Sequence, residues 1–119
     1  MHEQILSYSH PMLLRINTPM MPSWRRDSFQ AIFRFRNGYG ASVVQHKNSY
    51  GGDAGKYELA VARWNGPDDE DWSICYSTPI THDVIGHLDP RHVHSILSQL
   101  GALPPDAEAL PGATLDYET

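Results

Sequence analysis

The sequence predicts an α+β fold in which a four-stranded antiparallel β-sheet meander is packed on one face by a C-terminal α-helix. Two observations support this prediction. Four segments between residues 29 and 77 alternate apolar and polar side chains with the period of two that is typical of half-buried strands. Near residue 90 the period changes, and apolar side chains recur three and four positions apart, as in an amphipathic helix.

The first two predicted strands form a hairpin. Residues 29–36 alternate, with Phe33 and Phe35 on the same side. Asn-Gly at residues 37–38 is the commonest two-residue hairpin connection. A second strand is therefore predicted at 41–46.

The third predicted strand lies between two turns. Residues 49–55 hold three glycines and are read as a loop. Residues 57–62 alternate, as a strand does, and residues 65–71 then form an acidic turn, which we expect to be a solvated hairpin tip.

The fourth predicted strand covers residues 72–77. Trp72, Ile74 and Tyr76 share one side of it, which we assign to the apolar face, and Cys75 faces the other way.

The C-terminal helix has clear end signals. Thr81 is expected to cap a short helical turn first. Asp89 and Pro90 then form an N-cap followed by proline at the first helical position. Gly101 stands where a left-handed C-cap belongs. The apolar stripe consists of Val93, Ile96, Leu97 and Leu100.

The chain is expected to form one domain with two extensions. Residues 1–28 are punctuated by prolines and are read as an N-terminal arm with one weak strand at 12–16. Residues 29–103 form the domain, and residues 104–119 an acidic flexible tail.

Charge is divided unevenly along the chain, whose net charge is -5. Residues 1–66 hold eight Lys/Arg and four Asp/Glu, whereas residues 67–119 hold one Lys/Arg and ten Asp/Glu. Such a chain can present a basic and an acidic patch to a partner.

No apolar run is long enough for a membrane span, and one cysteine excludes an internal disulfide. We expect a protein of the bacterial cytoplasm that is a monomer or, through exposed sheet edges, a homodimer.

No motif predicts a reaction, a metal site or a cofactor. Four histidines lie within thirteen residues, but His92 and His94 are two apart on the predicted helix and point about 200° apart. Cys75 has no neighbouring feature that would activate a thiol. The loop at 51–56 departs from a phosphate-binding loop at several positions. The acidic run lacks the spacing of a calcium loop. We therefore do not expect an enzyme.

Four segments between residues 32 and 100 carry a distinctive string. They read NGYGASVV (37–44), SYGG (49–52), YELAV (57–61) and ICYSTPITHDVIGHL (74–88). Together they resemble a family of small, mostly uncharacterised proteins encoded by bacteriophages and prophages. The family offers no catalytic motif to transfer, so no residue inherits a role from it.

The resemblance implies a phage origin, and phage proteins of this size without enzymatic motifs often bind and block a host protein. Anti-CRISPR proteins and other inhibitors of bacterial defence are one such group, which is an argument from context. The expected function is therefore inhibition of a host protein by steric occlusion, with a CRISPR effector or nuclease as a candidate target.

Exposed aromatic and arginine side chains are the usual anchors of protein interfaces. The expected anchors are Trp24, Arg25, Arg26, Arg34, Arg36, Tyr39, Tyr50 and Trp64, with Asp68, Asp69, Glu70 and Asp71 as a second patch.

Three other functions stay open. A nucleic-acid-binding accessory protein would use arginines 25, 26, 34 and 36, although the acidic chain argues against nucleic acid. A hydrolase would use His82, Asp83 and His87. A virion component is the third.

Overall fold

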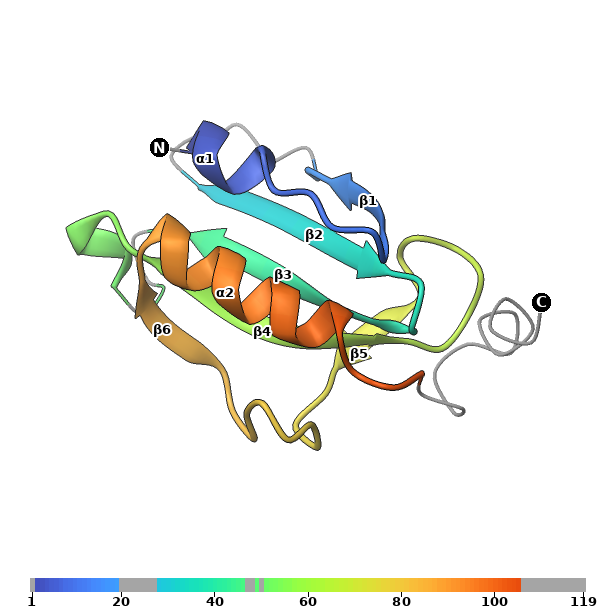
Figure 1. The fold of residues 1–119 in the computed structure, drawn as a ribbon. Coiled ribbons are helices and arrows are strands. Elements are labelled where there is room, and N and C mark those ends of the chain that lie inside the picture. Colours follow the sequence, from blue (N-terminus) through green and yellow to red (C-terminus); the bar gives the residue numbers. More distant parts are fainter. Residues whose placement is uncertain (1, 20–27, 47–48, 50, 106–119) are drawn as a thin grey trace.

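The computed structural model describes residues 2–19, 28–46, 49 and 51–105. They form a twisted antiparallel sheet with a long helix across one face (Figure 1). In chain order the elements are α1 (His2–Leu6), β1 (Leu13–Asn17), β2 (Phe29–Phe35), β3 (Tyr39–Gln45), the 3-10 helix η2 (Gly52–Ala54), β4 (Tyr57–Trp64), β5 (Trp72–Ile74), β6 (Ile85–Leu88) and α2 (Pro90–Gly101).

The described part of the sheet has six strands, and every pair is antiparallel. The order is β1-β2-β3-β4-β5, and β6 also pairs with β4. The α+β class and the antiparallel sheet are confirmed, but the predicted number of four strands is too low. The two strands beyond the predicted four-stranded meander are β1 and β6.

The face beneath α2 holds the main core. Phe33, Leu59, Val93 and Leu97 are all completely buried there. They come from β2, β4 and α2, so the period-two and helical patterns meet as the sequence predicts. Figure 1 shows α2 in orange lying along β3 and β4.

Both ends of α2 are held by side chains. Asp89 is the N-cap, and its carboxylate accepts a hydrogen bond from the His92 backbone N–H at 3.0 Å. At the other end the Asn37 side-chain amide donates to the carbonyls of Leu100 and Leu103, at 2.8 and 3.1 Å. Asn37 of the hairpin turn therefore also closes the helix C-terminus.

Gly101 has a different role from the predicted left-handed C-cap. It is the last helical residue, and Ala102 follows it with right-handed geometry. A Cβ added at Gly101 would lie 3.0 Å from the rings of His10 and Phe35. A side chain here would therefore force these rings to shift by a few tenths of an ångström, so the glycine favours close packing.

The segment expected as an N-terminal arm carries α1 and β1. Ile5 is fully buried in the core, and the Tyr8 hydroxyl lies 3.0 Å from Ser98 Oγ of α2. The His94 ring donates to the Gln4 carbonyl at 2.7 Å. Residues 2–17 therefore pack on the same core as the predicted domain.

β5 presents the opposite side from the one predicted. Cys75 is buried in the main core, whereas Ile74 is 43% exposed and Tyr76 is 52% exposed. The Cys75 backbone N–H donates to the Val61 carbonyl at 2.8 Å, which holds the chain beside β4. The side chains of residues 74–76 therefore alternate as predicted, but the Cys75 thiol faces the core beneath α2.

The expected helical turn after Thr81 is absent. The Thr81 hydroxyl donates to the Asp83 carbonyl at 2.8 Å in a local turn, and β6 begins at Ile85. His87 of β6 has a φ of 58°, an unusual conformation that interrupts strand alternation.

None of the described helices is long and apolar enough to cross a membrane.

Candidate binding site on the second sheet face

The second face of the sheet is the side opposite α2. Side chains alternate across a strand, so residues paired with one another across the strands share this face. The register pairs Asn17 with Ile32, and Trp64 with Trp72. Ile32, Ala62 and Trp64 form a small buried cluster, against which Trp72 packs. The second face therefore has a limited apolar centre of its own.

Trp64 is the structural centre of this cluster. It is completely buried, and its indole N–H donates to the Asp69 carbonyl at 3.3 Å. A Cβ at Gly40 would come within 2.6 Å of the Trp64 ring, so the glycine lets the indole lie against β3. The structure places this expected anchor in the interior.

Arg34 is buried beneath the acidic loop of residues 65–71. Its guanidinium donates to the Pro67 carbonyl at 3.0 Å, to the Asp69 carboxylate at 3.1 Å and to the Gly66 carbonyl at 3.3 Å. It also lies 5.2 Å from the centre of the Trp64 ring. The loop, expected as a solvated hairpin tip, instead folds back onto the sheet.

Asp69 links this loop to two strands. One carboxylate oxygen binds Arg34, and the other binds Arg15 of β1 at 3.0 Å. Desolvation acts to raise the pKa of Asp69, but hydrogen bonds from Arg34 and Asn17, with the charges of both arginines, hold it below its usual value. Asp69 therefore stays ionised under neutral conditions.

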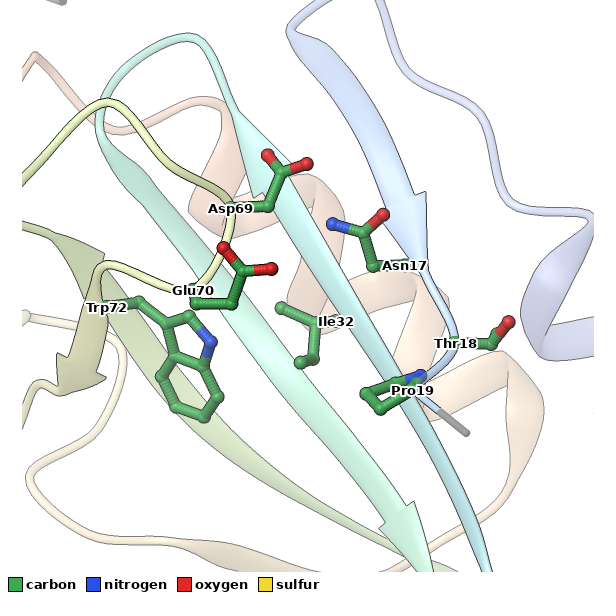
Figure 2. A pocket seen from close by; sticks show the side chains of 7 residues that line it. All are labelled: Asn17, Thr18, Pro19, Ile32, Asp69, Glu70 and Trp72. Atoms are coloured by element: carbon green, nitrogen blue, oxygen red, sulfur yellow. The ribbon is translucent and has the colours of Figure 1, made fainter. Parts of the chain in front are cut away.

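A hollow of about 310 Å³ lies beside this ion-pair network. Figure 2 shows Ile32 between two walls: Trp72 and Glu70 stand on one side, and the end of β1 stands on the other. The lining residues are Asn17, Thr18, Pro19, Ile32, Asp69, Glu70 and Trp72. The hollow combines an aromatic wall, an apolar centre and carboxylates.

An apolar strip continues from the hollow along the sheet edge. We define the apolar strip as Trp72, Ile74 and Tyr76. Trp72 lines the hollow and is half-buried, whereas Ile74 and Tyr76 are exposed. These side chains were expected in the core, and the structure makes them surface features.

The other expected anchors are distributed over the molecule. Arg36 is exposed and Tyr39 is half-buried. In the acidic patch, Asp69 is half-buried, whereas Asp68, Glu70 and Asp71 are exposed. The anchors that lie outside the described residues are Trp24, Arg25, Arg26 and Tyr50.

The sequence interpretation missed most residues of the hollow. Ile32 carried one signal, because it is an apolar residue on the otherwise polar side of its strand. Asn17 and Pro19 carried none, because only the pairing of β1 with β2 brings them beside the acidic loop.

Two of the residues considered for a hydrolase, His82 and Asp83, make local hydrogen bonds, and the third, His87, lies in β6. The His82 ring bonds the Tyr76 carbonyl at 3.0 Å, and Asp83 accepts from the Val84 backbone N–H at 2.7 Å. Within the described ranges, no three His, Cys, Asp or Glu side chains come together as a group that could hold a metal ion.

Comparison of the chain with protein-family models, curated proteins and solved structures gives no match.

Proposed function

We propose that this chain is a phage-encoded binding protein that inhibits a bacterial host protein by steric occlusion. A CRISPR effector or nuclease is the target class to test first. The observation that carries the proposal is the exposed apolar strip beside the hollow on the second face.

The apolar strip has the composition of an interface centre. Exposed Ile74 and Tyr76 lie next to half-buried Trp72, and the charged loop of residues 65–71 borders them. Aromatic residues are enriched at interface hot spots, and polar groups form the rim. A standard interface covers about 800 Å² on each partner, a small part of the 6897 Å² surface of this chain.

The phage context is part of this proposal and follows from the resemblance expected for the four segments given above. Three of them, residues 37–44, 57–61 and 74–88, contribute to β3, β4, β5 and β6. The last of these segments includes two residues of the apolar strip. The resemblance and the surface argument therefore concern the same part of the chain.

A nucleic-acid partner has weaker support. Arg34 already binds Asp69 and two loop carbonyls, so its guanidinium is engaged within the fold. The carboxylates around the hollow would repel phosphate groups.

The first test is capture from host lysate at low and moderate salt. We compare the wild type with a double variant, Ile74→Thr/Tyr76→Asp, and with a control, Leu6→Asp, whose parent side chain is 39% exposed on α1. The wild type and the control should retain a stoichiometric partner, the double variant should lose it, and the wild type should inhibit that partner's activity. No stoichiometric partner at either salt, or equal retention by the double variant, would refute the proposal.

The CRISPR target is tested separately by phage plating on a host whose CRISPR system targets that phage. Expression of the wild type should restore plating, whereas the double variant should not. Unchanged plating with the wild type would remove that CRISPR system as the target.

A further inference from the structure

We infer that the hollow is a socket for the guanidinium group of an arginine side chain on the protein partner. This inference rests on the proposed function and deepens it, because it assigns a chemistry to the partner surface that meets the second face.

The walls of the hollow suit both halves of an arginine side chain. Ile32 and Pro19 supply apolar contacts for an aliphatic stem, and Trp72 supplies an aromatic face beside Glu70 (Figure 2). A guanidinium is planar and weakly hydrated, so it stacks on an indole more readily than an ammonium does. An arginine is therefore a better match than a lysine.

The acidic loop keeps a net negative charge, and one carboxylate at the hollow is unpaired. The acidic run of residues 68–71 has four carboxylates against the two arginines bound there, Arg15 and Arg34, which both pair with Asp69. Of the four carboxylates, those of Asp69 and Glu70 line the hollow. Among the described residues, the Glu70 carboxylate makes no hydrogen bond or ion pair. This carboxylate is therefore available to pair with a cation from a partner.

Other occupants fit this hollow less well. An apolar side chain would take water from the Glu70 carboxylate without replacing its hydrogen bonds, which is costly. A phosphate or carboxylate would meet like charge from the unpaired Glu70 carboxylate. A guanidinium can bond the Glu70 carboxylate while it stacks on Trp72.

The test is a nuclear magnetic resonance titration that follows the Trp72 indole N–H. The probes are an acetylated and amidated Gly-Arg-Gly peptide, the same peptide with neutral citrulline, the same peptide with lysine, and spermidine. The arginine peptide should give a saturable shift at millimolar concentration. Its dissociation constant should be about tenfold lower than that of the citrulline peptide, and lower than those of the lysine peptide and spermidine.

Two isosteric variants show whether Glu70 is responsible. Glu70→Gln should weaken binding of the arginine peptide about fivefold, because a charge-assisted hydrogen bond becomes neutral. Asp68→Asn removes the same charge from an exposed neighbour that does not line the hollow, and it should change binding less than about twofold. Equal effects of the two variants would show only a general electrostatic attraction between the acidic loop and the cationic peptide, and would overturn the socket.

The remaining outcomes are also decisive. Equal binding of the citrulline peptide would rule out the guanidinium, and equal binding of the lysine peptide or spermidine would rule out an arginine-selective site. The peptide titration does not use the host protein. A failed titration with successful capture from lysate would therefore refute the socket and leave the proposed function standing. A successful titration with failed capture would refute the proposed function and leave a site that binds arginine.

Discussion

The two faces of this sheet are closed by different physical means. On the first face, α2 covers a continuous apolar core in which Phe33 and Leu97 are completely buried. On the second face, a loop folds back and is held by ion pairs of Asp69 with Arg34 and Arg15. The centre of the first face is completely buried, whereas the second face has a hollow of about 310 Å³ and an exposed apolar strip.

This difference indicates how stability and binding are divided. Apolar burial is non-directional and contributes in proportion to area, so the first face supplies most of the stability. Ion pairs are directional and can hold a loop without filling the space beside it. The second face can therefore be rigid and still expose a surface for a partner.

The largest effect is expected in the closed core. Phe33→Ala removes a fully buried ring beneath α2 and should lower the free energy of unfolding by about 3–5 kcal/mol. Urea unfolding measures it. A loss no greater than that of a surface substitution would show that the core is not packed as described.

The next effect separates the two arginines that share Asp69. The side chain of Arg34 is 7% exposed and that of Arg15 is 55% exposed. Arg34→Ala should cost about 2–4 kcal/mol, because it leaves Asp69 and two loop carbonyls without their buried donor. Arg15→Ala should cost about 0–1 kcal/mol, as an exposed pair does. Similar costs in urea unfolding would contradict the burial of Arg34.

A smaller effect should follow pH through Asp69. Its pKa is lower in the folded protein than its ordinary value of 3.8, so its stabilising contribution is present above that value. The contribution is lost as the pH falls through the depressed pKa. The difference in melting temperature between wild type and Asp69→Asn should therefore be constant near neutral pH and shrink in acid. A difference that persists unchanged at low pH would contradict the ion pairs.

The smallest effect on folding is expected in the apolar strip. Tyr76→Ser changes an exposed side chain and should alter the free energy of unfolding by less than about 0.5 kcal/mol. The same variant should weaken capture of the host partner. A large loss of stability would instead assign Tyr76 to the fold.

The first face was largely predictable from local sequence patterns. Phe33 and Phe35 lie two apart, and Val93 and Leu97 lie four apart, so strand and helix periods alone assign them to a core. Asp89 likewise marks the helix start through a local hydrogen bond. Such signals require only neighbouring residues.

The second face depends on contacts between residues that are distant along the chain. Arg34 and Asp69 are 35 positions apart, and no local pattern pairs them. Because both sheet faces contain apolar residues, the alternation of Trp72 and Ile74 did not reveal which face they occupy. β6 was missed because it has only four residues and its apolar side chains, Ile85 and Leu88, lie three positions apart instead of two.

Amide hydrogen exchange on the complex with the captured host protein tests most directly whether the second face is the docking surface. We predict slower exchange across residues 66–77, which include most of the acidic loop and all of the apolar strip, and unchanged exchange across α2. Protection confined to α2, with none at 66–77, would contradict the assignment of binding to the second face.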